Sequence, residues 1–212
     1  MAISSKQIRE LLTEVAQMFI ERRDELAKLD SMIGDGDHGI SMARGAKAVL
    51  EVLDRMEDTE APNEYFKAYG RTLVRTMGGA IGPLFGIIFT EFGECIKVEN
   101  EFNKISFVNG ISNATKKIMD FGGAKPGDKT MVDVMYPLSE KLNTLDLDTY
   151  LFSSLTNTAH KFALVYLEET KPMMARKGRS KFLMEKSIGY QDAGATSFTY
   201  LLEKINDYIR RI

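Results

Sequence analysis

The chain has 212 residues, of which 44% are hydrophobic and 27% are charged, with a formal net charge of −2 and an isoelectric point near 5.8. This length suits one well-buried core, so we expect a single domain over residues 1–212. The charge balance excludes the basic footprint of nucleic-acid binding, and no apolar run suits a membrane span or signal peptide. One cysteine, Cys95, excludes an internal disulfide and favours a reducing, cytoplasmic location.

Apolar residues at helical spacing predict eight helices, and no stretch alternates like a strand, so we expect an all-α fold. The first helix is expected from Ile8 to Asp30. Pro137 lies inside the sixth helix and should bend it or mark an early turn. The remaining seven runs cover residues 42–53, 62–77, 83–92, 107–119, 131–142, 148 to about 172, and 195–209.

The junctions between these helices are rich in glycine and charge. In an up-and-down bundle alternate connections lie at the same end, so several of these junctions are expected to converge on one site. They comprise residues 30–41, 78–83, 122–130, 176–180 and 189–197.

The first junction gathers three aspartates within eight residues, Asp30, Asp35 and Asp37. Carboxylates this close repel one another, which favours a hard divalent cation between them. Asp35 and Asp37 are two residues apart and point to the same side of an extended segment. A calcium EF-hand is excluded, because Ile40 and Ala46 stand where that loop needs Gly and Glu. An ordinary solvated turn stays the alternative.

Two further junctions are glycine-rich. Residues 78–84, Gly-Gly-Ala-Ile-Gly-Pro-Leu, lead into a helix N-terminus, whose free amides favour a phosphate; a tight helix corner is the alternative. Residues 122–130 are not a phosphate-binding P-loop, because Asp128 separates the last glycine from Lys129 and the preceding pattern is helical. Lys129 and Thr130 then either contact phosphate or cap the next helix.

Two charged positions near the C-terminus also stand out. Arg179 belongs to a basic cluster over residues 176–186 that is mostly a solvated face, but it follows a glycine in an expected loop. It is therefore the candidate donor to a transferring phosphoryl group or to a partner's phosphate. Asp192 precedes the last helix and either caps it, reaches a ribose or organises the basic loop.

Five motifs occur in an order that resembles the nucleotide-binding L subunits of dihydroxyacetone kinase. That resemblance covers nearly the whole chain and implies a barrel of eight antiparallel helices with ADP or ATP and magnesium at one end. The motifs are Ile-Gly-Asp-Gly-Asp-His-Gly at 33–39, Gly-Gly-Ala-Ile-Gly-Pro-Leu-Phe-Gly at 78–86, Pro-Gly-Asp-Lys-Thr-Met-Val-Asp at 126–133, Ala-Arg-Lys-Gly-Arg at 175–179, and Ser-Ile-Gly-Tyr-Gln-Asp-Ala-Gly-Ala-Thr-Ser at 187–197.

The resemblance also implies roles for individual residues. Asp30, Asp35 and Asp37 would bind two Mg²⁺ ions that bridge the nucleotide phosphates. Arg179 and His38 are the catalytic candidates: Arg179 would stabilise the transferred group, and one hypothesis has His38 carrying it. The implied nucleotide contacts are His38, Gly39, Ile40, Ser41, Gly79, Ala80, Ile81, Gly122, Met131, Arg179, Asp192, Ala193 and Gly194.

The implied activity is a phosphotransferase subunit that works only with partners. A chain of one domain resembles the separate form, in which a phosphohistidine-carrying M subunit of the phosphoenolpyruvate phosphotransferase system rephosphorylates bound ADP. The phosphoryl group then passes to dihydroxyacetone on a K subunit. A homodimer stays open.

Five positions depart from residues common in that family, while the metal loop is intact. Two of these departures, Ile81 and Tyr190, motivate an alternative, a non-catalytic, nucleotide-sensing regulatory paralogue that docks on another protein. Ile81 stands in place of Ser, Met184 in place of Gly, Lys186 in place of Arg, Tyr190 in place of His, and Ala193 in place of Pro.

Overall fold

The computed structural model describes residues 3–58 and 60–212, which contain only helices and connections, with no strand among them. The expectation of an all-α fold is therefore confirmed. The helices are α1 (Ser5–Glu21), α2 (Arg23–Ile33), α3 (His38–Asp54), α4 (Pro62–Thr76), α5 (Ile81–Glu99), α6 (Lys104–Gly122), α7 (Val132–Asn143), α8 (Phe152–Glu169) and α9 (Ala193–Arg211), with the 3-10 helices η1 (Leu147–Thr149) and η2 (Ser180–Ser187).

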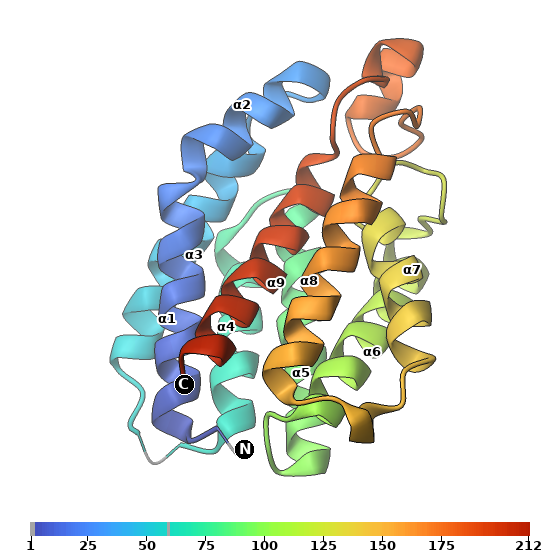
Figure 1. The fold of residues 1–212 in the computed structure, drawn as a ribbon. Coiled ribbons are helices and arrows are strands. Elements are labelled where there is room, and N and C mark those ends of the chain that lie inside the picture. The colour runs from blue at the N-terminus through green and yellow to red at the C-terminus, as the bar shows by residue number, and fades with distance from the viewer. Residues whose placement is uncertain (1–2, 59) are drawn as a thin grey trace.

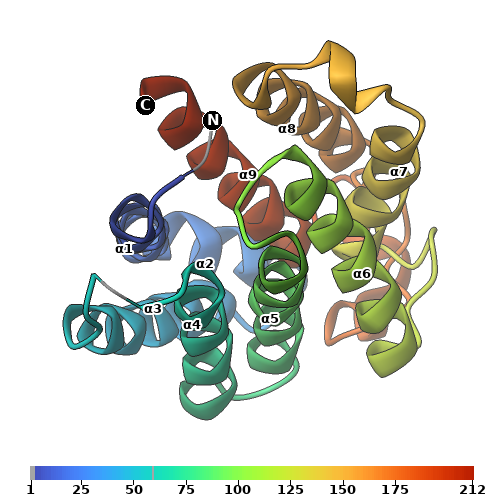
Figure 2. The same ribbon diagram turned by 90° about the horizontal axis from the view of Figure 1, so that it is seen from below.

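Eight of the α-helices form a closed ring. Going round the ring, α1, α3, α4, α5, α6, α7, α8 and α9 each contact the next, and α9 returns to pack on α1 (Figure 2). Successive ring helices run in opposite directions (Figure 1). The expected barrel of eight antiparallel helices is therefore confirmed, and α7 continues through Pro137.

The first expected helix is divided into two. Arg22 has a ψ of 11°, which ends α1, and α2 then continues to Ile33 at a changed angle (Figure 1). The Arg22 side chain is held against α9, because its guanidinium carbon lies 3.8 Å from the Tyr200 ring centroid and its Nη2 donates to Glu203 at 2.9 Å. Apolar spacing continues across this break, so the pattern could not reveal it.

The ring is filled by one apolar core that contains a cluster of six phenylalanines from four helices and one connection. The helices α4 and α5 pack backbone to backbone, since a Cβ on Gly70 would lie 2.7 Å from the Gly86 carbonyl oxygen. Within the described residues, no helix combines the length and apolar composition needed to cross a membrane. The cluster consists of Phe66, Phe89, Phe92, Phe102, Phe107 and Phe152.

Two buried tyrosines of α4 allow a matched test of the core. The Tyr69 hydroxyl is buried with no hydrogen-bond partner among the described residues, whereas the Tyr65 hydroxyl donates to the Glu57 carbonyl. Removing a hydroxyl that has no hydrogen-bond partner breaks no hydrogen bond and relieves the cost of burying a polar group. Tyr69→Phe should therefore leave the free energy of unfolding unchanged or raise it by about 1 kcal/mol. Tyr65→Phe should lower it by about 1 kcal/mol. Urea unfolding followed by circular dichroism compares them, and a clear loss in Tyr69→Phe contradicts the expectation.

Candidate functional site

Four connections meet at the end of the barrel opposite the two termini (Figure 1). They are residues 34–37, 77–80, 123–131 and 170–192, and together they line a cavity of about 360 Å³. The predicted convergence of junctions is therefore found in the structure. A wider groove of about 620 Å³ between α1 and α3 contains none of the predicted site residues. Of the predicted residues, the cavity is lined by Asp30, Asp35, Asp37, His38, Gly79, Ala80, Ile81, Gly122, Met131, Arg179, Asp192, Ala193 and Gly194.

The three aspartates converge at this end. One carboxylate oxygen from each of Asp30, Asp35 and Asp37 lies within 4.8 Å of the other two. Burial, with the charge of Asp37 as a smaller contribution, raises the pKa of Asp30. Arg179 comes from the distant basic loop to pair with Asp35, and its Nη2 lies 3.9 Å from Asp37 Oδ2. The carboxylate cluster thus attracts the guanidinium cation of Arg179, and a set of donors made only of oxygen atoms suits a hard divalent metal.

The tight turn between α2 and α3 requires its glycines. A Cβ on Gly34 would lie 2.3 Å from Asp30 Oδ1, and one on Gly39 would lie 2.0 Å from the Arg23 carbonyl oxygen. Gly39 therefore lets α3 approach the backbone of α2. Gly39, Ile40 and Ser41 do not line the cavity: Ile40 is exposed and Ser41 is buried.

His38 is the first residue of α3 and faces the cavity from a buried position. Its Nε2 lies 2.7 Å from Ser197 Oγ on α9, so the ring joins two helices of the site. Burial lowers the pKa of His38 to about 4, which makes the imidazole neutral at neutral pH.

Helix N-termini supply favourable charge to the cavity. Because ring helices alternate in direction, α3, α5, α7 and α9 all begin at this end. The N-cap side chains of the first three accept no hydrogen bond, but His38 N at the start of α3 donates to Asp30 Oδ2 at 3.3 Å, and Val132 N at the start of α7 donates to a neighbouring threonine. Among the described residues no side chain caps α5, so its first amide groups are left for an anion. Gly79 has a φ of 70° and open space around it, whereas Gly82 packs against Met77. The glycine-rich segment therefore forms both a lining loop and a tight corner.

Hydrogen bonds shape the connection between α6 and α7. Asp133 accepts from the amides of Gly127 at 2.5 Å and Thr130 at 2.7 Å, and Thr130 Oγ1 accepts from Val132 N at 3.1 Å. Thr130 therefore has the predicted capping role. Lys129 has neither predicted role, because its Nζ donates to main-chain carbonyl groups; burial lowers its pKa.

Asp192 caps α9. Its Oδ2 accepts from Ala195 N at 2.8 Å, which agrees with the capping alternative. Burial raises the pKa of Asp192 to about 6, and the negative charge of Asp133 adds to the effect, whereas the Ala195 amide and Lys129 oppose it.

The cavity also has an apolar part that the motifs did not indicate. Leu84, Ile118 and Phe121 line it beside Ile81 and Val132. Phe121 is 62% exposed although phenylalanine is usually buried, and it lies at the end of α6 beside Gly122. Its place outside the buried stripe of that helix was a usable sequence signal.

Comparison with known proteins identifies the family. The DAK2 domain family matches residues 32–207. The chain is 34% identical to the ADP-binding subunit DhaL of the PEP-dependent dihydroxyacetone kinase of Escherichia coli (strain K12), over 97% of each chain. It is 33% identical to the corresponding subunit of kinase 2 of Listeria innocua, over 95% of this chain and 93% of that one. This chain therefore belongs to the DAK2 domain family.

More distant relatives are longer than this chain. An L-erythrulose 1-kinase of Mycolicibacterium smegmatis is 30% identical over 98% of this chain but only 36% of its own length. The dihydroxyacetone kinase from C. freundii, solved in complex with AMP-PNP and Mg²⁺, shares the fold with a TM-score of 0.72 at 23% identity. The match covers 98% of this chain and 34% of that one.

The departures from common family residues concentrate around the cavity and the basic loop. Ile81 and Ala193 line the cavity, whereas Met184 lies in η2 with a φ of 48°. That left-handed conformation costs a methionine roughly 1–2 kcal/mol relative to the glycine common there. Met184 is therefore a strained position in the loop that carries Arg179.

The titration of Asp192 gives a testable pH dependence. Its pKa is raised to about 6 in the folded state, so the protonated acid contributes stability that is present below pH 4 and lost as pH rises through 6. Asp192→Asn keeps a capping oxygen but cannot titrate. The free energy of unfolding of the wild type minus that of the variant should therefore be larger at pH 4 than at pH 7, by up to about 2 kcal/mol. Urea unfolding without nucleotide or metal measures it; a pH-independent difference contradicts it.

Proposed function

We propose that this chain is the ADP-binding subunit of a phosphoenolpyruvate-dependent dihydroxyacetone kinase. In this role it takes a phosphoryl group from a phosphohistidine M subunit onto bound ADP and delivers it to dihydroxyacetone on a K subunit. The observation that carries the proposal is the juxtaposition of three carboxylates, an arginine and the N-terminus of α5, which no described side chain caps, at one cavity. The names of the relatives over nearly the full length support the same activity.

Asp30, Asp35 and Asp37 are the proposed ligands of two Mg²⁺ ions. Magnesium bound there would neutralise the charge of the nucleotide phosphates. The fit rests on the donor set, since three carboxylates within 4.8 Å need more positive charge than one arginine provides. Arg179, released from Asp35 by the metals, would be free to hold the transferring phosphoryl group. In this proposal the aspartates hold the metal ions, and Arg179 orients the transferring phosphoryl group.

The proposed nucleotide site uses both parts of the cavity. The diphosphate would lie at the polar part, against the starts of α3, α5 and α9 with His38, Gly79, Ala80 and Gly194. The adenine would lie against the apolar part, where Phe121 and Leu84 offer area for a ring. Ile81, Gly122, Met131, Asp192 and Ala193 complete the proposed contacts, whereas Gly39, Ile40 and Ser41 would act through the backbone of α3.

The rim of the cavity suits docking of the K and M subunits. Phe182 is 78% exposed and Met184 is 64% exposed on η2, and Ile188 and Met32 lie exposed on the neighbouring segments. Phe182 and Met184 stand within the basic cluster of residues 176–186, which includes the phosphate-binding candidate Arg179. Such a patch fits protein partners that present a phosphoryl group or its acceptor. The buried free thiol of Cys95 is consistent with the proposed cytoplasmic location.

Metal and nucleotide binding test the proposal directly. Denaturation of purified protein should release ADP with about two equivalents of Mg²⁺, the ratio expected when two metals clamp one diphosphate. Asp35→Asn should weaken Mg²⁺-dependent ADP binding by at least about 100-fold, since it removes a metal ligand. Titration calorimetry measures both variants, with Asp24→Asn on the exposed face of α2 as the control. Intact transfer by Asp35→Asn contradicts the mechanism.

The regulatory alternative gives a different result in the same reconstituted system. A nucleotide-sensing paralogue would bind ADP with Mg²⁺ yet transfer no phosphoryl group when K and M subunits are supplied. The intact carboxylate cluster and its pairing with Arg179 favour the transferase. The cavity position of Ile81 is the observation that keeps the alternative open to this test.

The path of the phosphoryl group is a separate prediction. His38 is buried and its Nε2 is occupied by Ser197, so we expect label from the phosphohistidine donor to appear in the nucleotide and not on His38. Rapid quench in base preserves any phosphohistidine, and chromatography separates protein from nucleotide. Acid-labile label on the wild type that disappears in His38→Asn but not in His160→Asn contradicts this path and makes His38 a covalent carrier.

A further inference from the structure

Lys129 is a buried cation that no carboxylate pairs with. It is 2% exposed, has a φ of 58°, and within the described residues no carboxylate oxygen lies within 4.0 Å of its ammonium group. Burying an ammonium group is costly unless its donors are satisfied. Its function must therefore be sought in the groups around Nζ.

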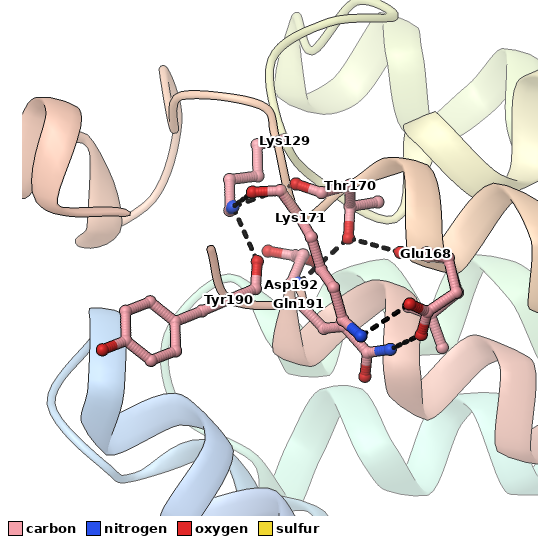
Figure 3. Close-up of polar contacts among 8 residues, drawn as sticks. Lys129, Glu168, Thr170, Lys171, Tyr190, Gln191 and Asp192 are labelled. Atoms are coloured by element: carbon pink, nitrogen blue, oxygen red, sulfur yellow. Dashed lines mark hydrogen bonds and ion pairs between the residues drawn. The ribbon is translucent and has the colours of Figure 1, made fainter. Parts of the chain in front are cut away.

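Four main-chain carbonyl oxygens surround Nζ. They belong to Thr170 at 2.9 Å, Lys171 at 3.3 Å, Met173 at 3.0 Å and Tyr190 at 2.7 Å. Figure 3 shows Lys129 beside Thr170, Lys171 and Tyr190. An ammonium group has three donors, so four carbonyl groups saturate it. The arrangement resembles the carbonyl cage that holds a monovalent cation.

These carbonyl groups come from the two ends of one loop. Residues 170–173 directly follow α8, and Tyr190 lies two residues before the Asp192 cap of α9. Between them lie residues 174–189, which carry Arg179 and the exposed side chains of Phe182, Met184 and Ile188. Lys129, from a third connection, therefore closes the base of this loop.

Besides the pairing of Arg179 with Asp35 and the packing of η2 against α2, few other interactions hold the loop. Its apolar side chains Phe182 and Met184 are exposed, so burial contributes little. Three hydrogen bonds assist Lys129 near the base: Gly189 N to the Lys171 carbonyl at 2.8 Å, Ala175 N to Ser187 Oγ at 2.9 Å, and Arg176 N to the Asp128 carbonyl at 3.0 Å. A loop fixed by polar contacts at its base depends on each of them.

We propose that Lys129 is a positioning residue for phosphoryl transfer, whose buried ammonium group fixes the Arg179 loop to the start of α9 so that both face the cavity together. This rests on the proposed function. The metal cluster lies on a different connection, between α2 and α3, and Asp192 keeps its own bond to Ala195. Loss of Lys129 should therefore disturb the placing of Arg179 far more than the binding of metal and nucleotide.

The first test uses Lys129→Met, which keeps the bulk of the side chain and removes the charge, in the full chain reconstituted with K and M subunits. We expect kcat for transfer to fall about 100-fold, the effect of a displacement near 1 Å, with ADP affinity in Mg²⁺ changed less than about fivefold. Lys125→Met, an exposed lysine on the same connection, is the matched control and should keep full activity. A Lys129→Met variant within twofold of wild-type kcat overturns the proposal.

Chemical rescue separates positioning from misfolding. Lys129→Ala lacks three carbons and the ammonium group, which n-propylammonium supplies, whereas n-butanol supplies similar bulk without charge. We expect n-propylammonium to restore transfer at least about tenfold and n-butanol to have no effect, because the four carbonyl groups need a cation. Equal rescue by both compounds, or rescue by neither, overturns the cage role.

Trypsin provides a readout independent of transfer, since residues 174–189 carry Arg176, Lys177, Arg179, Lys181 and Lys186. Lys129→Met should be cut in this loop at least about tenfold faster than wild type, and Lys125→Met at the wild-type rate, because opening of the base exposes the backbone. If the wild type transfers nothing, the proposed function fails. The loop role of Lys129 is then still decided by proteolysis, and equal cleavage of all three proteins overturns it.

Discussion

The alternation of helix direction around a closed ring is the constraint on which the site depends. With α9 packed against α1, every second ring helix must begin at the same end, and the connections there must share one mouth. The partial positive charges of α3, α5, α7 and α9 therefore sum where the three carboxylates lie. An anionic ligand and its cations are favoured at this end by topology before any side chain is considered.

Charge balance then connects parts of the chain that are far apart in sequence. Asp35 and Asp37 are paired with Arg179, which lies more than a hundred residues later on the longest connection of the barrel. That connection has little core of its own, and the buried ammonium group of Lys129 fixes its two ends. The arginine that meets the acidic turn is thus held in place by a buried lysine whose ammonium group is bound by main-chain carbonyl groups.

The sequence predicts most of the framework and part of the site. Helical spacing predicts every ring helix. The glycine-rich, charged junctions indicate one shared site, because alternate connections of an up-and-down bundle lie at the same end. The break at Arg22 was missed, since apolar spacing continues through it and the cause lies in contacts with α9. The role of Lys129 was missed for a related reason: its partners are backbone carbonyl groups, which no residue pattern can display.

The two halves of the site are held by different kinds of contact, and this bears on where this chain departs from residues common in its family. The acidic turn is fixed by close backbone packing, because Gly34 and Gly39 leave no room for a side chain. The Arg179 loop is held by polar contacts at its base and includes Met184 in a strained conformation. Four of the five departures from common family residues fall in or beside this loop, and none falls in the turn. Relatives in the family are named as kinases of dihydroxyacetone or of erythrulose. In the proposed function, a rigid acidic turn beside a loop held by polar contacts would allow the phosphate chemistry to stay constant while contacts with partner and acceptor change.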